Sequence, residues 1–150
     1  MIIEYLSDHP DAISELAGWY VSEWRPYYGD TGPGDARVDL EARLSREALP
    51  VGIVAMEGDR VLATAALGLD VTTILTPSII GLLVGHDHRR MGIGTALIKT
   101  CVDIARNLGH PRLYVSTSVL GGLLESMGWQ EMGETKFLND ERGSVYVHDL

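Results

Sequence analysis

The residues best suited to chemistry lie between Leu82 and Leu97, where an apolar run meets a short polar loop and two glycines. The run through Val84 predicts a strand, and the segment after the glycines predicts an amphipathic helix. Such a turn aims unpaired backbone N–H groups, at the positive end of a helix dipole, at one point in space. Gly92 and Gly94 allow an anion to approach the main chain closely. The pattern therefore predicts a phosphate-binding turn.

Two adjacent arginines, Arg89 and Arg90, add positive charge beside this turn. A Walker phosphate loop requires Gly-Lys-Ser/Thr, and the sequence contains no such tripeptide. A dinucleotide fold requires Gly-x-Gly-x-x-Gly, but Leu97 occupies the third glycine position and no acidic residue ends a strand about twenty residues on. The turn is therefore expected to bind another nucleotide-like cofactor.

Composition limits the partners that the protein can have. The formal net charge is −9, and the first 50 residues hold 10 acidic and only 4 basic side chains. Nucleic acid is a poor partner for such a surface, which favours solubility or the steering of a cationic substrate. The 150 residues suit one domain, and 45% of them are apolar, as is ordinary for a soluble globular protein.

No membrane span, secretory signal or internal disulfide is expected. The sequence has no run of about 18 uncharged apolar residues and no basic segment followed by an apolar one at its start. The single cysteine, Cys101, falls at helical spacing with Leu97 and Ile104, which predicts a buried core thiol. These features favour a cytoplasmic location.

The hydrophobic pattern predicts the element order β-α-α-β-β-β-α-β-α-β-β. A helix that Ser7 or Asp8 caps is expected to run to about Trp24, and a loop rich in glycine and proline follows it. Strands are expected at residues 2–6, 51–56, 60–69, 79–84, 112–117, 130–137 and 144–148, and further helices at 35–48, 94–108 and 119–127.

The spacing Arg89-x-x-Gly92-x-Gly94 after a strand resembles the coenzyme A loop of the GNAT family of N-acetyltransferases. The element order resembles that family along nearly the whole chain, and residues 123–129 resemble its closing helix and Gly–aromatic turn. The resemblance implies one α/β acetyltransferase domain over residues 1–150. Its central sheet would be mixed, mostly antiparallel and twisted, splayed between the fourth and fifth strands, with helices on both faces.

The resemblance also implies acetyl-CoA as cosubstrate, with no metal. Gly81 and Gly85 bracket the strand before the loop and favour a bulge whose freed amide would donate to the acetyl oxygen. The pantetheine arm and acetyl group would lie along this strand, and the diphosphate would lie on the loop. The residues implied are Leu82, Leu83 and Val84 for the arm, and Arg89, Arg90, Met91, Gly92, Ile93, Gly94 and Thr95 for the loop.

The implied reaction is direct attack of a neutral amine on acetyl-CoA in a ternary complex, which requires a route for the amine's proton. Leu124 stands where many family members place a tyrosine, and Ile80 stands where some place a glutamate. Proximity and water can carry the proton, or another hydroxyl can substitute. The candidate substitutes are Tyr114, Ser116, Thr117 and Tyr146.

The acceptor is expected to be a primary amine of a small, cationic molecule, since Tyr27, Tyr28 and Asp30 supply aromatic walls and a carboxylate. The alternatives are a non-catalytic acyl-CoA-binding sensor or interaction module, and a protein N-terminal or lysine acetyltransferase. Homodimers are frequent in the family, so a homodimer is a possible partner. The segment His86-Asp87-His88 invites a metal interpretation, but a solvated or phosphate-flanking loop is preferred.

Overall fold

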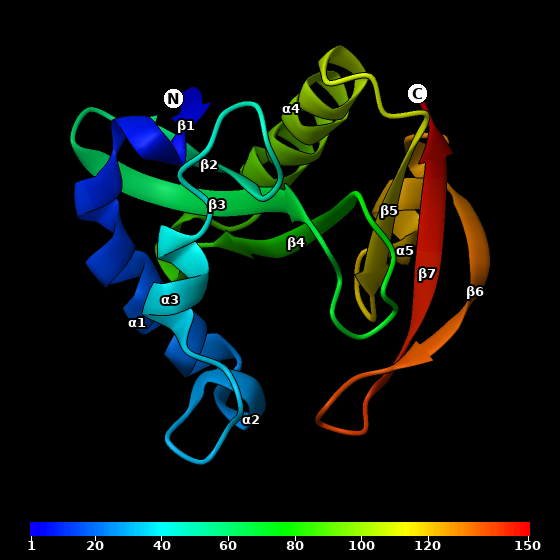
Figure 1. The fold of residues 1–150 in the computed structure, drawn as a ribbon, viewed down its shortest axis with the longest axis horizontal. Coiled ribbons are helices and arrows are strands. Elements are labelled where there is room, and N and C mark those ends of the chain that lie inside the picture. The colour runs from blue at the N-terminus through cyan, green and yellow to red at the C-terminus, as the bar shows by residue number, and fades with distance from the viewer.

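A computed structural model describes residues 1–150, and its centre is a seven-stranded sheet in the order β1-β2-β3-β4-β5-β7-β6 (Figure 1). Neighbouring strands pair antiparallel except β4 and β5, which are parallel. The mixed, mostly antiparallel sheet that the sequence predicts is confirmed. The strands are β1 (Ile2–Tyr5), β2 (Val51–Glu57), β3 (Arg60–Gly68), β4 (Ser78–Val84), β5 (Arg112–Thr117), β6 (Gln130–Lys136) and β7 (Arg142–Asp149).

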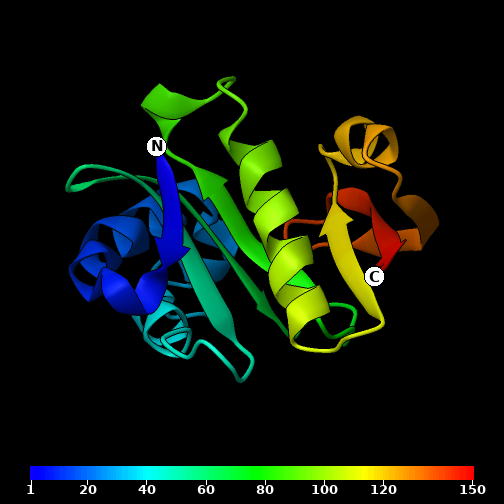
Figure 2. The same cartoon turned by 90° about the horizontal axis from the view of Figure 1, so that it is seen from above.

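Helices cover both faces of the sheet, as expected, and Figure 2 shows the longest of them, α4, lying over one face. A cluster of 17 buried residues joins α4 and α5 to that face, and a cluster of 11 joins α1 and α3 to the other. The helices are α1 (Ile13–Glu23), α2 (Arg25–Tyr28), α3 (Ala36–Glu41), α4 (Ile93–Asn107) and α5 (Gly121–Ser126), with 3₁₀ turns at Leu6–Asp8, Pro10–Ala12 and His86–His88.

The α4 helix buries one side because its apolar residues recur at intervals of three and four. Ile93, Leu97 and Cys101 are each at most 4% exposed and pack in the larger core. Gly109 follows the helix with φ +86°, the left-handed conformation that commonly ends a helix. The buried, unpaired cysteine that the spacing predicts is confirmed.

The Cys101 thiol is expected to resist an aromatic disulfide reagent in the folded protein. Burial raises the pKa of this thiol to about 12, so that about 10⁻⁴ of it is thiolate at pH 8. Release of the reagent's aromatic thiol should be slow in buffer and complete within minutes in guanidinium chloride. Rapid stoichiometric reaction of the folded protein would contradict the packing described for α4.

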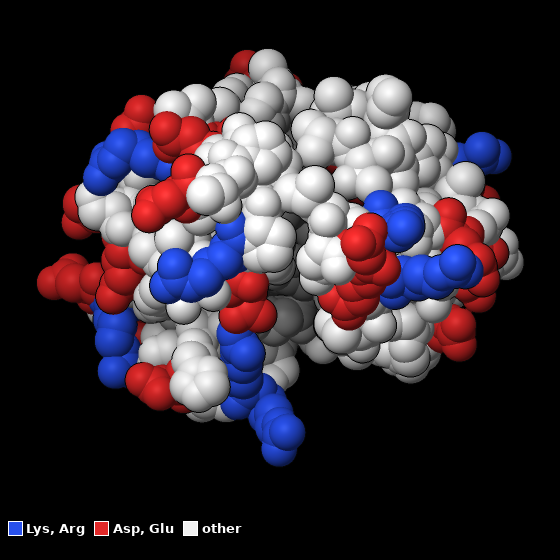
Figure 3. Space-filling view, turned by 90° about the horizontal axis from the view of Figure 1, so that it is seen from below, with Lys and Arg blue, Asp and Glu red and all other residues white.

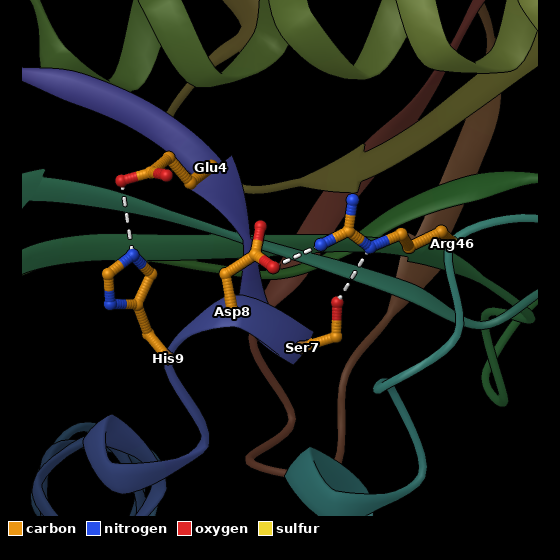
Figure 4. Close-up of polar contacts among 5 residues, drawn as sticks. All are labelled: Glu4, Ser7, Asp8, His9 and Arg46. Carbon is orange, nitrogen blue, oxygen red and sulfur yellow. Dashed lines mark hydrogen bonds and ion pairs between the residues drawn. The ribbon is translucent and has the colours of Figure 1, made fainter.

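The start of the first long helix differs from the prediction. Neither Ser7 nor Asp8 caps it, because Arg46 holds both: its Nε donates to Ser7 Oγ at 3.1 Å, and its Nη2 pairs with the Asp8 carboxylate (Figure 4). Two 3₁₀ turns precede α1, which begins only at Ile13 and has no side-chain cap.

The helix expected over residues 35–48 is also too long, because α3 ends at Glu41. Its end is set by contacts with β2. Gly52 N–H donates to the Arg43 carbonyl at 2.9 Å, and Leu44 forms an isolated β-bridge with Val51. These contacts with the following strand replace the intrahelical bonds that the apolar pattern predicts.

Other boundaries move by a few residues. The short helix α2 lies inside the segment expected to be a loop, while α5 begins at Gly121 and β7 begins at Arg142. None of the helices is both long and apolar enough to cross a membrane.

Candidate functional site

The strands β4 and β5 meet at one end and separate toward the other. Their one aligned pair is Ser78–Tyr114, beside which the Tyr114 N–H donates to the Pro77 carbonyl at 3.0 Å. Beyond this pair the strands run in different directions (Figure 1), so the ends at Val84 and Thr117 are unpaired with each other. The predicted splay between the fourth and fifth strands is confirmed, and it exposes strand edges that a regular sheet would cover.

Gly81 lies at a bulge in β4, as the sequence predicts. The β3–β4 register shifts between Thr64 and Ala66, so that two β4 residues oppose one β3 residue. Gly81 has φ +59°, and a Cβ at this position would lie 2.3 Å from the Tyr20 hydroxyl oxygen. Both the backbone conformation and the lack of space require glycine here.

A buried chain of two hydrogen bonds supports this bulge; it is formed by Tyr20 of α1 and by Arg43, which follows α3, and is called the Tyr20–Arg43 relay below. The Tyr20 hydroxyl donates to the Gly81 carbonyl at 2.6 Å and accepts from Arg43 Nη1 at 2.9 Å. Burial raises the pKa of the Tyr20 hydroxyl more than the neighbouring Arg43 cation lowers it. The hydroxyl therefore keeps its proton at neutral pH and can hold the Gly81 carbonyl in one direction.

Sequence reasoning missed this relay. Tyr20 follows Ile13 and Leu16 in the apolar stripe of α1, so it was indistinguishable from an ordinary core residue. Arg43 did carry a signal, because it follows Ala36 and Leu40 at helical spacing and so places a cation on an apolar face.

The loop between β4 and α4 presents unused backbone donors. No residue from Arg89 to Gly92 donates a backbone hydrogen bond within the protein, and the first turn of α4 has no side-chain cap. A Cβ at Gly92 would have no atom within 4 Å, and a Cβ at Gly94 would meet only a Val84 methyl at 4.0 Å. The surface above both glycines is open, as an anion-binding turn requires.

The two arginines of this loop differ in their contacts. Arg89 Nη2 pairs with the Glu23 carboxylate at 3.2 Å, and its Nε donates to the Val84 carbonyl at 3.1 Å. Arg90 has φ +65°, is exposed and forms no ion pair. The structure therefore ties Arg89 to α1 and leaves the Arg90 guanidinium available at the loop.

The hydroxyls that were candidates for proton transfer lie on two different faces. Val115 packs in the larger core with Tyr146 of β7. On the same side of β5, the Thr117 hydroxyl accepts from the backbone N–H groups of Val119 and Leu120 at 3.1 and 3.0 Å, in the turn before α5. Tyr114 and Ser116 alternate with these residues along β5 and are half-buried on the opposite face. Desolvation, Glu131 and Glu125 raise the pKa of Tyr146, in that order.

The aromatic residues expected at the acceptor side are partly structural. Tyr28 stacks on Tyr20 at 5.5 Å between ring centroids, and its hydroxyl donates to Asp39 at 2.7 Å. The Tyr27 ring meets Tyr28 edge-on at 4.7 Å, and Asp30 is exposed without an ion pair. Tyr28 and Asp30 line a pocket of about 440 Å³ beside α2.

The surface has two further features. A second pocket, of about 460 Å³, is bordered by α1 and the turn after β4, with Trp19, Glu15 and Glu23 in its wall. Figure 3 shows a hollow between the two halves of the molecule, on the face that carries α2 and the β6–β7 turn. No group of three or more His, Cys, Asp or Glu side chains is arranged to hold a metal ion.

The model of the acetyltransferase (GNAT) family matches residues 13–122, which is most of the chain and includes α1, the splayed strands and the loop. The chain belongs to the GNAT family. The GNAT membership inferred from the loop glycines and the element order is thereby confirmed.

Several known proteins are similar to this GNAT chain. Human N-acetyltransferase 8 is 26% identical over 127 residues, which cover 79% of this chain and 56% of that protein. An aminoglycoside 6'-N-acetyltransferase solved with coenzyme A superimposes with a TM-score of 0.79 at 16% identity, covering 99% and 97% of the two chains. N-acetylglutamate synthase from Neisseria gonorrhoeae, solved with coenzyme A and N-acetyl-glutamate, superimposes with a TM-score of 0.70 at 18% identity. The match covers 100% of this chain and 35% of that one.

The chain spans about half the length of human N-acetyltransferase 8. The two solved structures are less than 20% identical to this chain, so the likeness to them establishes the fold alone. Whole-protein activity is a separate inference that must come from the residues of this site.

Proposed function

We propose that this protein transfers an acetyl group from acetyl-CoA to a primary amine of a small molecule by direct attack in a ternary complex. One observation carries the proposal: free backbone donors at the start of α4 follow a strand, β4, that is bulged where it pairs with β3 and unpaired with β5 beyond Ser78. A diphosphate suits the donors, and an extended amide-containing arm suits the strand edge. Membership of the GNAT family and the neighbours solved with coenzyme A support this assignment.

Each part of the cofactor has a proposed binding surface. The diphosphate would accept from the loop amides, with the Arg90 side chain as the free cation and the Thr95 hydroxyl nearby. The pantetheine arm would pair with the open edge of β4. The full set proposed is Leu82, Leu83 and Val84 on the strand, and Arg89, Arg90, Met91, Gly92, Ile93, Gly94 and Thr95 on the loop.

The chemistry proposed at the bulge is stabilisation of a developing oxyanion. The amine nitrogen forms a bond to the thioester carbon, the carbonyl oxygen gains charge, and the bond to the coenzyme A sulfur then breaks. An amide freed at the β4 bulge would donate to that oxygen, and loss of such a donor costs about 3 kcal/mol in comparable enzymes. Tyr20 and Arg43 would fix the strand in the required position.

The amine's proton leaves by water or by a hydroxyl near the splay. Tyr114 and Ser116 are the proposed candidates on the face toward α1, and Thr117 and Tyr146 are those on the face toward α5. Because the Thr117 hydroxyl is already bonded in the turn before α5 and Tyr146 is 6% exposed, the first pair is the better placed for contact with solvent.

The acceptor is proposed to enter beside α2, past Tyr27, Tyr28 and Asp30. The acidic side chains of the first 50 residues would attract its ammonium group, since 10 of the chain's 21 carboxylates lie there. Tyr28 would serve as a wall whose hydroxyl is already committed to Asp39.

A second candidate function is acyl-CoA binding without turnover. Leu124 is fully buried at the position where many family members place a tyrosine, and the glutamate of other members is replaced by Ile80. These apolar residues favour a sensor. A protein N-terminus or lysine is an alternative acceptor for the catalytic case.

Two measurements test the proposal. Calorimetric titration reports acetyl-CoA binding, and thiol release reports turnover with a panel of small amines and an amine-bearing peptide. Binding with amine-dependent release supports the transferase, and binding without any release supports the sensor. Absence of binding at millimolar acetyl-CoA would overturn both.

The Arg90→Ala substitution is expected to weaken acetyl-CoA binding roughly three- to tenfold, and more than Arg89→Ala does. Arg90 is exposed and unpaired, whereas Arg89 is held by Glu23 and the Val84 carbonyl. The loss should shrink as salt rises, because an exposed charge is screened. Titrations of both variants at low and high salt measure this, and a larger loss for Arg89→Ala would show that Arg89 leaves Glu23 for the cofactor.

A further inference from the structure

Arg43 is a buried cation without a carboxylate partner. The residue is 6% exposed, and none of the ion pairs in the protein includes it. Asp39, one helical turn earlier, lies beyond ion-pair distance and instead accepts the Tyr28 hydroxyl. Removing a charge from water costs several kcal/mol unless a partner compensates, so a buried unpaired arginine needs an explanation.

Part of the Arg43 guanidinium remains available to a ligand. Its one hydrogen bond is from Nη1 to the Tyr20 hydroxyl, so Nε and Nη2 have no partner within the protein. No fully buried side-chain nitrogen in the chain lacks a hydrogen bond, so these two atoms retain contact with solvent. The guanidinium therefore offers donors in the fork geometry that fits a carboxylate.

Arg46, three residues later, shows the contrast. Its guanidinium is bound by Ser7 and Asp8 (Figure 4). Both guanidinium groups lie over a tyrosine ring, Arg46 at 4.9 Å from the centre of Tyr5 and Arg43 at 5.7 Å from the centre of Tyr20, so the contrast between them is the acid. The Arg46 side chain is 50% exposed, so water supplies what the protein does not. The more deeply buried arginine is the one that lacks an acid.

The position of Arg43 connects it to the reaction proposed above. Its Nη1 lies 2.6 Å from where a Cβ of Gly81 would be, on the face of β4 that turns toward α1 and α3. Gly81 is part of the bulge at which the acyl group is proposed to react. A group bound by Arg43 would thus lie beside the bulge at which the amine is proposed to attack.

We propose that Arg43 binds a carboxylate of the acceptor, and that the acceptor class is a small amino acid or another amine with a carboxylate close to its reactive nitrogen. This inference rests on the proposed acetyl transfer and specifies its substrate. It also fits the charge distribution, since exposed acids attract the ammonium group and a buried cation receives the carboxylate. A zwitterion satisfies both.

Matched pairs of acceptors that differ only in the carboxylate test the proposal. The pairs are glycine and methylamine, L-phenylalanine and 2-phenylethylamine, and L-lysine and cadaverine. Thiol release from acetyl-CoA should favour the carboxylate member of at least one pair by roughly 10- to 100-fold in kcat/KM. Arg43→Met should remove that preference, and it should still fold because an apolar side chain suits this buried position.

Equilibrium binding separates this inference from the transferase function. Protein saturated with coenzyme A is titrated with both members of each pair. Equal use of the members, or a preference that Arg43→Met retains, overturns the inference while the transferase function stands. If no amine releases thiol, the transferase function fails; Arg43-dependent binding of the carboxylate members then still supports the anion site, and its absence overturns the inference too.

Two further variants serve as controls. Arg46→Met removes a neighbouring arginine that has its own partners, and it should leave the carboxylate preference unchanged. Arg43→Lys keeps the positive charge but lacks the forked donors of the guanidinium, so it should retain part of the carboxylate preference that Arg43→Met loses. A purely structural role for the guanidinium would not predict this. Loss of the preference in Arg46→Met would show that general charge, not Arg43, produces it.

Discussion

Gly92→Ala is expected to weaken acetyl-CoA binding by about tenfold or more while the protein remains folded. Gly92 has φ +78°, so alanine there costs roughly 1–2 kcal/mol of backbone strain. No atom lies within 4 Å of the added methyl group, so the fold itself has room for it. The methyl group would instead occupy the space above the loop donors that a diphosphate requires. Calorimetric titration measures the affinity, and thermal unfolding measures the strain.

Gly109→Ala is the matched control for this prediction. Gly109 has φ +86° at the other end of the same helix, and its added methyl group also meets nothing within 4 Å. The two variants should therefore lose similar stability, and only Gly92→Ala should lose affinity. Equal affinities in both variants would mean that the cofactor does not lie on this loop.

The loop was predictable because its chemistry is local. The strand, the arginines and the two glycines are contiguous, so residue order alone places the donors and clears the space above them. The bulge was predictable in part, since Gly81 interrupts an apolar strand. The splay followed from the family resemblance rather than from any residue pattern.

The support beneath the bulge was not predictable, because its partners are distant in sequence. Tyr20 and Gly81 are 61 positions apart, and nothing near Tyr20 distinguishes its hydroxyl from that of any other core tyrosine. The end of α3 was also missed, since contacts of residues 43 and 44 with the following strand β2 fix it and helical periodicity does not report them. Periodicity reports which face is apolar, but it does not report which polar atom finds a partner there.

Gly81→Ala is expected to lower kcat about 100-fold or more and to cost roughly 2–4 kcal/mol of stability. Its methyl group would lie 2.3 Å from the Tyr20 hydroxyl oxygen and 2.6 Å from Arg43 Nη1, so the bulge or the relay must shift. A shift moves the amide that is proposed to meet the acyl oxygen. Turnover at saturating acetyl-CoA and chemical denaturation measure the two losses.

Gly58→Ala isolates the backbone part of this effect. Gly58 has φ +58° in the β2–β3 turn, nearly the value of Gly81, and nothing lies within 4 Å of its added methyl group. It should cost about 1–2 kcal/mol and leave turnover unchanged.

The contact part of the Gly81→Ala effect can be isolated by a second substitution at its nearest neighbour. Tyr20→Phe removes the hydroxyl oxygen that the new methyl group would approach at 2.3 Å. The double variant should therefore be more stable than the sum of the two single losses predicts, since contacting residues are not additive. Its turnover should stay low, because the Gly81 carbonyl has then lost the donor that held it at 2.6 Å. Additive stability losses would show that the hydroxyl does not set the position of the bulge.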